Sequence, residues 1–272
     1  TYVYTGNSSA RSINTGIDMT QGGLVWTKAR VGTYNHQLTD SVRGVTKQLW
    51  SNTGDQEQTN SDYVTAFNNN GFSLGTNSNV NGNTDDHVAW SFRKAPGFFD
   101  VVTWTGNGTN GRTIAHSLGC IPGHIAIKDL TGGEDWAVYH TTTKATHSLM
   151  WQSTGAKTDS AYFWNDTEPT ASVFTVGTES KVNNSSKNYV AYLFAGGAST
   201  AATARSVDGF DGYDGSSWDS LQITNNSDYQ FGSGDFTVEC WYKMNTSTDT
   251  DNRALISNFN YANTRRSWVL QV

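Results

Sequence analysis

Apolar and small residues alternate along short stretches of this chain. Val88, Trp90 and Phe92 lie at every second position, and the residues between them, Ala89 and Ser91, are small. Successive side chains of a β-strand point to opposite faces of the sheet, so a period of two is typical of half-buried antiparallel strands. The pattern predicts that the three large residues share one face. Their small neighbours are expected to face solvent or a neighbouring domain.

Stretches rich in glycine and asparagine separate the expected strands. Residues 68–71 and 81–83 consist only of Asn and Gly, which favour turns. Residues 39–50 are ambiguous between helical and irregular structure, because Gly44 and the β-branched Val42 disfavour a helix. The pattern as a whole predicts an all-β protein of antiparallel β-sandwiches.

The chain also matches itself over two collinear units. A unit of this length can bury its own core and is too long for one turn of a solenoid. We therefore predict one β-sandwich at residues 1–97 and a second at 98–197. The matching segments are 4–7 with 104–107, 11–13 with 112–114, 49–54 with 150–155, 72–76 with 174–178, and 88–92 with 190–194.

The two units differ in one loop and in some of their tryptophans. The first has Asp-Ser-Val-Arg-Gly at 40–44, whereas the second aligns Thr-Thr-Thr-Lys-Ala at 141–145. Trp50 and Trp151 fall at matching positions, as expected of a repeated core. Three tryptophans without such counterparts are candidates for exposed or interface positions: Trp136, Trp164 and Trp218.

A third region follows the second unit. Residues 198–205 are rich in Ala, Ser and Thr, a composition typical of a linker. Further on, Phe236, Val238 and Cys240 alternate with polar residues in the manner of a sandwich strand. We predict that residues 206–272 are the first part of a jelly roll. Val272 is then expected to lie inside a domain of a longer native chain.

Two family resemblances follow from these segments. Residues 40–44, 70–75, 88–90 and 98–107 resemble a repeated β domain of uncharacterised function, which occurs in tail, fibre and other structural proteins of marine phages, cyanophages especially. The third region looks like the opening of a laminin-G or concanavalin-like jelly roll. Its matching segments are 221–223, 229–243, 255–257 and 267–272.

These resemblances imply a structural protein of a virus particle. The two sandwiches would act as spacers or decoration in a tail fibre, appendage or capsid fibre on the particle surface, and the jelly roll would contact a host glycan. Implied partners are further copies of the chain, with a trimer as the common arrangement for fibres, and other virion proteins. Two alternatives stay open: a carbohydrate-binding module of a secreted glycan-active enzyme, and a bacterial surface adhesin. A catalytic domain after Val272 would favour the module.

Composition excludes some other classes. Charged residues make up 15% of the chain, the formal net charge is −6, and the 18 Lys and Arg residues are scattered. Nucleic-acid binding needs clustered basic residues, so it is not expected. No apolar run reaches the roughly 18 residues of a spanning helix, so membrane insertion is not expected either. Cys120 and Cys240 fall in different predicted domains, which argues against a disulfide.

One motif suggests a nucleotide site but lacks its context. Residues 106–111 match G-x-G-x-x-G after an expected strand. In a dinucleotide fold this motif opens a helix, whereas residues 112–116 are predicted to form another strand. The matching segment 6–10 also lacks two of the three glycines. We interpret 106–111 as a hairpin turn.

Candidate catalytic and metal-binding residues are sparse. The carboxylate pairs Asp85-Asp86 and Glu134-Asp135 fall in polar loops, where solvated charges are the ordinary case. No metal-ligand spacing links the histidines, which are His36, His87, His116, His124, His140 and His147. We therefore expect no enzyme activity and assign no catalytic or cofactor-binding residue.

Calcium is the one cofactor that the sequence raises. Asp208, Asp211 and Asp214 lie close together among glycines, and clustered carboxylates can hold Ca²⁺. Their spacing is not that of an EF-hand loop, and a solvated turn is the simpler interpretation. Ten tryptophans also make sugar stacking a hypothesis, although a repeated core explains several of them equally well.

Overall fold

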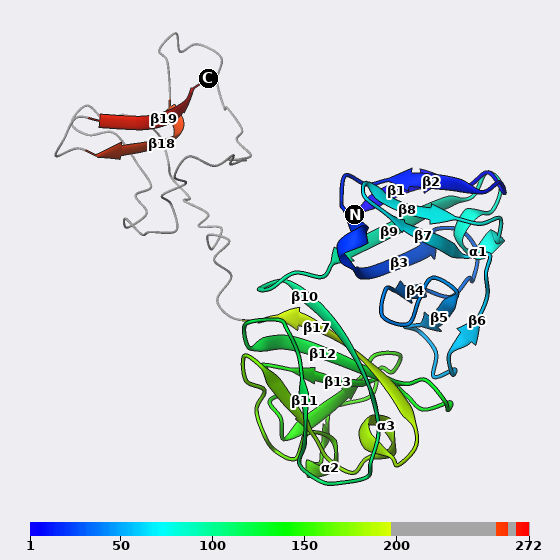
Figure 1. Ribbon diagram of the computed structural model, residues 1–272, viewed down its shortest axis with the longest axis vertical. Coiled ribbons are helices and arrows are strands. Elements are labelled where there is room, and N and C mark those ends of the chain that lie inside the picture. The colour runs from blue at the N-terminus through cyan, green and yellow to red at the C-terminus, as the bar shows by residue number, and fades with distance from the viewer. Residues whose placement is uncertain (197–253, 261–264, 272) are drawn as a thin grey trace. The chain divides into compact units, whose positions relative to one another are not determined.

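The computed structural model describes residues 1–196, 254–260 and 265–271 (Figure 1). The chain divides into two compact units, residues 1–205 and 206–272. The predicted all-β class is confirmed, because the described part consists mainly of antiparallel sheets. No helix among the described residues is long and apolar enough to cross a membrane.

The first unit contains two lobes, which we call lobe 1 (residues 1–97) and lobe 2 (residues 98–196). Lobe 1 has a six-stranded sheet in the order β1-β9-β3-β4-β5-β6 and a three-stranded sheet in the order β2-β8-β7. The short helices η1 (Met19–Gln21) and α1 (Ser78–Asn81) complete it. Its strands are β1 (Tyr2–Thr5), β2 (Arg11–Asn14), β3 (Gly23–Ala29), β4 (Gln37–Asp40), β5 (Lys47–Trp50), β6 (Gln58–Thr59), β7 (Val64–Asn68), β8 (Gly71–Leu74) and β9 (Asp86–Arg93).

Lobe 2 has a six-stranded sheet with the corresponding order, β10-β17-β12-β13-β14-β15, and a two-stranded sheet, β11-β16. Its helices are α2 (Ala161–Trp164) and α3 (Ser180–Asn183). The strands are β10 (Phe99–Thr105), β11 (Arg112–Ala115), β12 (Pro122–Asp129), β13 (Ala137–His140), β14 (His147–Met150), β15 (Thr158–Asp159), β16 (Val173–Val176) and β17 (Asn188–Ala195).

The lobes differ in that α2 of lobe 2 stands where lobe 1 has the turn before β7, and within residues 98–196 no strand equivalent to β7 follows it. Backbone bonds fix this correspondence, since Gly75 N donates to Tyr63 O as Gly177 N donates to Phe163 O. The β-branched Val64 favours a strand in lobe 1. In lobe 2 the Ser160 side chain accepts a hydrogen bond from Tyr162 N and caps the helix, and Asn165 ends it at a φ of 51°. Asn60 caps the corresponding turn of lobe 1 in the same way, because its side chain accepts a hydrogen bond from Asp62 N (2.8 Å). The cap is therefore common to both lobes.

In the second unit the structure describes one antiparallel pair, β18 (Ala254–Asn260) and β19 (Arg265–Gln271). The predicted linker at 198–205 and most of the predicted jelly roll lie outside the described residues. So do Trp218, Cys240 and the acidic residues Asp208, Asp211 and Asp214. Cys120, in lobe 2, is half-buried and its thiol is free.

The predicted faces of β9 are assigned the wrong way round. Ala89 is buried in the core of lobe 1, where it meets Val25 and Phe72. Phe92, on the opposite face, packs against residues of lobe 2. The physical reason is that the second lobe covers the outer face of the six-stranded sheet. Phe92 is partly buried against that lobe, while Ala89 faces the core inside the sandwich.

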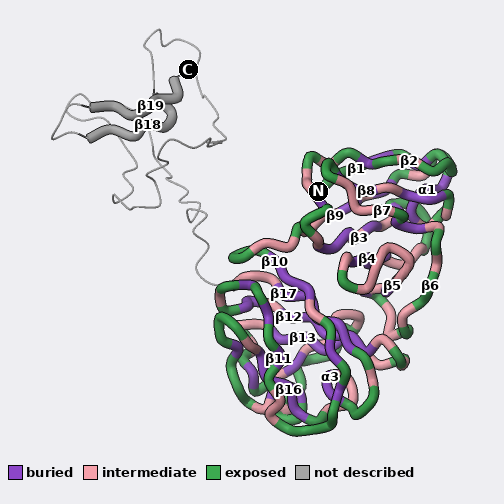
Figure 2. The backbone as a smooth tube through the Cα atoms, viewed as in Figure 1, coloured by how far each residue is buried: buried purple, intermediate pink, exposed green. Residues whose placement is uncertain are grey.

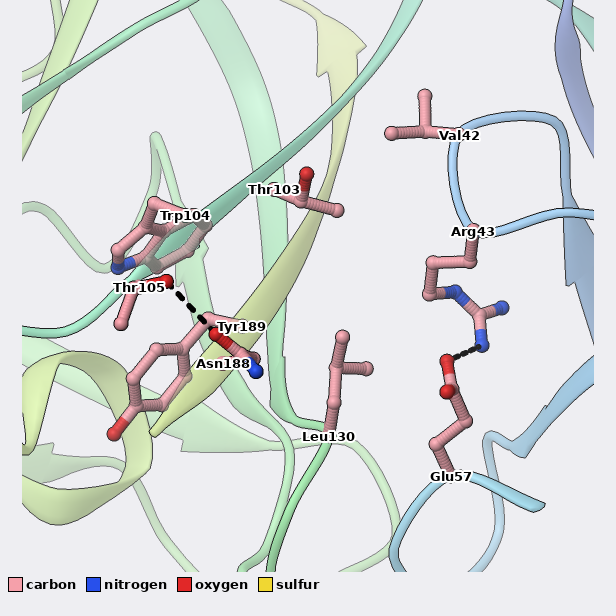
Figure 3. A pocket seen from close by; sticks show the side chains of 9 residues that line it. All are labelled: Val42, Arg43, Glu57, Thr103, Trp104, Thr105, Leu130, Asn188 and Tyr189. Atoms are coloured by element: carbon pink, nitrogen blue, oxygen red, sulfur yellow. Dashed lines mark hydrogen bonds and ion pairs between the residues drawn. The ribbon is translucent and has the colours of Figure 1, made fainter. Parts of the chain in front are cut away.

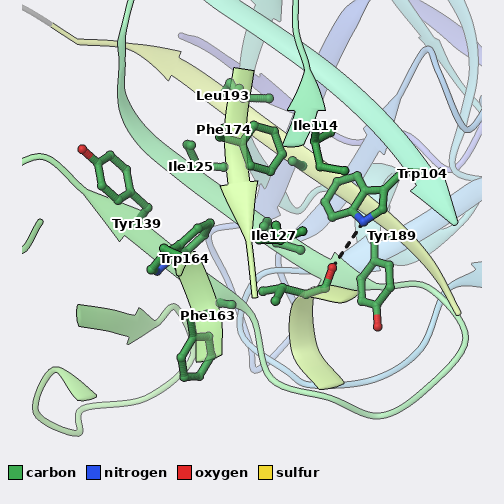
Figure 4. Close-up of a cluster of buried hydrophobic side chains, with 14 of the residues drawn as sticks. Trp104, Ile114, Ile125, Ile127, Tyr139, Phe163, Trp164, Phe174, Tyr189 and Leu193 are labelled. Carbon is green, nitrogen blue, oxygen red and sulfur yellow. Dashed lines mark hydrogen bonds between the residues drawn. The ribbon is translucent and has the colours of Figure 1, made fainter. Parts of the chain in front are cut away.

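Buried side chains form three hydrophobic clusters. One lies inside lobe 1, a larger one inside lobe 2, and the third between the lobes. Figure 4 shows the lobe 2 core, in which Trp104 meets Tyr189 with ring centroids 5.4 Å apart. Figure 2 shows buried residues running along β10, β17 and β12. Each six-stranded sheet thus has two covered faces.

The strand ladders correct the sequence alignment by one residue. Gln37 pairs with Trp50 in lobe 1, whereas Ala137 pairs with Met150 in lobe 2. Met150 is therefore the counterpart of Trp50, and the predicted match with Trp151 is wrong. A shift of one residue moves a side chain to the other face of the strand. By the same ladder, residues 140–144 and not 141–145 correspond to 40–44.

Two segments differ from the structure expected of them. Residues 39–50 are strands β4 and β5 joined by a turn, which excludes the helical alternative. The glycine-rich segment 106–111 connects β10 to β11, which belong to different sheets. It is therefore a loop between sheets rather than a hairpin turn.

A buried asparagine anchors the loops in each lobe. The Asn81 Oδ1 atom accepts a hydrogen bond from Asn7 N (3.1 Å), and its Nδ2 atom donates to the carbonyl oxygens of Ser9 and Gly75 (both 2.8 Å). Asn183 makes the corresponding bonds in lobe 2, with Asn107 N, Thr109 O and Gly177 O. Both side chains are fully buried, and the bonds to Gly75 O and Gly177 O are buried with them, so each asparagine satisfies a backbone carbonyl inside the lobe.

We expect Asn81→Ala and Asn183→Ala each to lower the free energy of unfolding by at least about 1–3 kcal/mol, because each leaves buried backbone groups without partners. Urea denaturation of the full chain, followed by tryptophan fluorescence, measures the loss. Asn69→Ala, at an exposed turn, is the control. Equal midpoints for the control and the two variants would contradict the anchoring role.

Candidate functional site

A cleft of about 430 Å³ lies between the lobes, where the turn after β4 faces strands β10 and β17 (Figure 3). Arg43 and Glu57 stand on the lobe 1 side, and the lobe 2 side presents Thr103, Thr105 and Asn188. The remaining lining residues are Val42, Trp104, Leu130 and Tyr189.

Arg43 joins the two lobes through hydrogen bonds. Its Nε atom donates to the Asp40 carboxylate (2.5 Å) and Nη1 donates to Glu57 (3.1 Å). Its Nη2 atom donates to Leu38 O (3.3 Å) and to the hydroxyl of Tyr192 in lobe 2 (3.0 Å). The Tyr192 hydroxyl in turn donates to Asp40 Oδ2 (2.9 Å). We call Asp40, Arg43, Glu57 and Tyr192 the inter-lobe network.

The turn after β4 is built to present Arg43. Asp40 Oδ1 accepts hydrogen bonds from Val42 N (3.0 Å) and Arg43 N (2.9 Å), and Gly44 takes a φ of 102° that side chains rarely adopt. The same carboxylate thus shapes the turn and binds the guanidinium that the turn presents.

Lobe 2 forms the corresponding turn without an ion pair. His140 Nδ1 accepts from Thr142 N (3.1 Å), and the Thr143 hydroxyl donates to His140 O (2.9 Å). Thr143 stands where lobe 1 has Arg43. The network therefore exists once, at the turn whose sequence differs between the two units.

Burial and charge set the protonation states of the network. Burial by itself lowers the pKa of Arg43, but the charge of Asp40 and the bonds to Tyr192 and Glu57 outweigh it and raise that pKa above its ordinary value. Burial also raises the pKa of Tyr192 well above its ordinary value. Arg43 therefore stays charged and Tyr192 stays a hydrogen-bond donor at physiological pH.

The carboxylates of this cleft are engaged by cations, which favours a role in holding the turn and the lobes together over a role in catalysis. The Asp40 and Glu57 carboxylates both accept hydrogen bonds from Arg43, and Lys47 Nζ lies 3.2 Å from the second oxygen of Glu57. A general base needs a lone pair directed at substrate, whereas these carboxylates are engaged by cations. On the opposite wall the Thr105 hydroxyl donates to Asn188 Oδ1 (2.8 Å).

Further contacts extend the junction beyond the cleft. Trp136 Nε1 donates to Trp50 O (2.8 Å), and Glu57 N donates to Leu130 O (3.1 Å). The rings of Trp26 and Trp151 lie 5.4 Å apart. Aromatic packing and hydrogen bonds to backbone carbonyls thus join the lobes together with the bonds of the Tyr192 hydroxyl.

The three tryptophans predicted to be exposed or at an interface lie in different environments. Trp136 is fully buried in the cluster between the lobes, so the interface interpretation is correct. Trp164 is 1% exposed in the lobe 2 core, so neither interpretation holds for it. Its ring packs against Tyr139 at 5.8 Å. Trp218 lies outside the described residues.

The histidines do not form a metal centre. Among the described residues no group of three His, Cys, Asp or Glu side chains could hold a metal ion. His124 and His140 are neighbours, with ring centroids 6.2 Å apart, and His124 also packs on Trp151 at 5.6 Å. Burial, with a smaller effect of His140, lowers the pKa of His124 from 6.5 to about 4.

The candidate carboxylate pairs serve local structure. Asp86 accepts a hydrogen bond from the Thr5 hydroxyl (3.0 Å). Glu134 lies 3.6 Å from the amines of Lys181 and Lys187, and Asp135 accepts from Gln152 (2.6 Å). The predicted loop position is wrong for Asp86, which begins β9 and pairs with Thr5 across the ladder. All of these contacts are ordinary ion pairs and hydrogen bonds.

Sequence reasoning missed the role of Arg43. It singled out 40–44 as the loop in which the units differ, yet the partner residue Tyr192 lies 149 positions away. An arginine three residues after an aspartate, present in one unit and absent from the other, is the signal that could have directed attention to a special contact.

Comparison with known proteins gives a family and no function. One family, described as a domain of unknown function (DUF7483), matches residues 1–203, and the chain belongs to it. This single match spans both lobes. No curated protein and no solved structure matches the chain.

We expect Arg43→Ala to lower the free energy of unfolding by about 3–5 kcal/mol, because it leaves the Asp40 carboxylate buried without a cation. Tyr192→Phe should cost about 1–3 kcal/mol through lost hydrogen bonds. Thr143→Ala, at the corresponding turn of lobe 2, is the matched control and should change stability by less than about 1 kcal/mol. Urea denaturation measures all three, and an Arg43 variant as stable as the control would refute the network's role.

Acid should weaken the junction through His124. The unfolded chain binds a proton near pH 6.5, whereas the folded state resists protonation down to about pH 4. Stability from this residue is complete above pH 6.5 and is lost as the pH falls toward 4. His124→Leu introduces the residue found at the lobe 1 position, Leu24, and should reduce the drop in melting temperature between pH 7 and pH 4. His147→Gln is the control, and equal pH profiles for wild type and His124→Leu would contradict this.

Proposed function

We propose that this member of the DUF7483 family is a structural component of a virus particle, in a tail fibre, appendage or capsid-decorating fibre. Residues 1–196 act as a rigid two-lobed body, and the region after residue 205 contributes recognition of a host glycan. The protein works by packing and recognition, and is not an enzyme. Its partners are further copies of itself and other virion proteins.

The observation that carries this proposal is that the lobes are joined both by an apolar junction and by the inter-lobe network. Two sandwiches joined only by a linker would move independently, because inter-domain motion is the default without a large apolar interface. Here Leu38 and Leu49 of lobe 1 pack in one cluster with Tyr192 and Val138 of lobe 2. The hydrogen bond from Arg43 to Tyr192 adds a contact that depends on the orientation of the two lobes. A structural component of a particle has to keep a fixed geometry, and the joined lobes support that role.

The way in which the lobes meet also limits their role. Both lobes use the outer face of the six-stranded sheet, as Leu49 and its counterpart Leu149 illustrate. When two units pack through the same face, the contact closes on itself and does not propagate. Each chain therefore supplies one closed block, and length in a fibre would come from assembly of several chains.

Electron cryomicroscopy of purified virus particles tests this proposal. We expect a two-lobed density at regular positions on an appendage or on the capsid, identified by antibodies against the full chain. Particles that carry Arg43→Ala should show blurred density for one lobe, while particles that carry Thr143→Ala should match wild type. Absence of the chain from particles, together with its recovery beside a secreted glycan-active enzyme, would overturn the structural role.

A further inference from the structure

A second hollow, of about 440 Å³, lies where lobe 1 leads into lobe 2. Three segments meet there: the turn before η1, the end of β9 and the connection that follows it. The lining residues are Gly16, Ile17, Asp18, Ser91, Arg93, Ala95 and Phe98. This volume is within the range of small-molecule sites, about 300–1,000 Å³.

A fixed carboxylate and an unengaged guanidinium line the hollow. Asp18 Oδ1 accepts hydrogen bonds from Thr20 N (3.0 Å) and from the Thr20 hydroxyl (2.5 Å), which hold the side chain in place. Those bonds also hold the pKa of Asp18 below its ordinary value. Within residues 1–196, no hydrogen bond or ion pair involves the side chain of Arg93. This differs from the inter-lobe cleft, where Arg43 is fully engaged.

An exposed aromatic ring lies beside this pair. Phe98 is 49% exposed, and one side of its ring packs on Phe92, with centroids 6.4 Å apart and planes 28° from parallel. That contact restrains the ring and leaves much of it open to solvent. Ile17 adds apolar surface to the same hollow.

One residue of the hollow has a polar atom without a partner. The Ser91 hydroxyl is buried and makes no hydrogen bond to any described residue. Buried hydroxyls in folded proteins are nearly always satisfied, so this one sets the site apart from an ordinary packed surface.

We propose that this hollow binds a neutral sugar ring, stacked on Phe98 and hydrogen-bonded to Asp18 and Arg93. Because a carboxylate and a guanidinium line the same hollow, a ligand of either net charge is disfavoured. Neighbouring hydroxyls of a sugar fit them, because one hydroxyl donates to the carboxylate while the next accepts from the guanidinium. The apolar C–H face of the ring covers the aromatic side chain. This inference rests on the recognition part of the proposed function and assigns lobe 1 a glycan site of its own.

Saturation-transfer NMR titration of the full chain with methyl glycosides of glucose, galactose and mannose tests the site. Saturable binding of at least one of them is expected. Phe98→Ala and Arg93→Gln should each weaken binding about tenfold or more. Asp18→Asn should also weaken binding, because the charge is lost. The asparagine side chain still has an oxygen that can accept the hydrogen bonds from Thr20, so the turn is kept. Tyr162→Ala is the matched control, because Tyr162 is an aromatic residue of lobe 2 that is 64% exposed. An unchanged melting temperature checks that each variant is folded.

Three outcomes would overturn the inference. If wild type binds no methyl glycoside, the hollow is not a sugar site. If it binds but Phe98→Ala and Arg93→Gln bind equally well, the sugar site lies elsewhere in the chain, and the proposed recognition function survives. If methyl glucuronide binds and the neutral glycosides do not, the ligand class is wrong. The particle imaging described above tests the structural role independently of all three.

Discussion

The contact between Asp40, Arg43 and Tyr192 is the constraint on which the two-lobed body depends. A buried guanidinium is costly unless each of its donors is satisfied, and these residues satisfy it from both lobes at once. The charged members all lie in lobe 1, and the Tyr192 hydroxyl of lobe 2 completes the set by bonding to both Arg43 and Asp40. Apolar packing supplies attraction between the sheets, while these two directional hydrogen bonds favour the arrangement that keeps the Tyr192 hydroxyl in place.

The two lobes have corresponding six-stranded sheets but differ in the chemistry of the turn that carries this contact. If lobe 2 also carried an arginine at position 143, its charge would need its own carboxylate beside His140. Instead, lobe 2 holds the corresponding turn with uncharged hydrogen bonds. Asn81 and Asn183, by contrast, make the same bonds in both lobes. They anchor loops within a single lobe, and each lobe needs such an anchor.

The interpretation as a closed block follows from the same geometry. Each lobe buries its short-sheet side within its own sandwich and its outer face against the other lobe, so the pair uses up the surfaces through which it could stack. The DUF7483 family matches residues 1–203, a range that contains both lobes. This agrees with the interpretation of the two lobes as one block. Recognition then has to use edges, loops and hollows, and the hollow beside Phe98 is one of these.

The all-β class and the turn between β7 and β8 follow from the sequence alone, because alternation and turn chemistry act within a few neighbouring residues. The sequence could not assign the faces of β9, since either face of an alternating strand can be buried once a second lobe covers the sheet. Its alignment also placed Trp151 opposite Trp50, an error of one residue that only the hydrogen-bonded ladder reveals. The inter-lobe network and the hollow beside Phe98 were decided by the tertiary structure alone. Their residues are brought together by packing between distant segments, and no local pattern records which segments will meet.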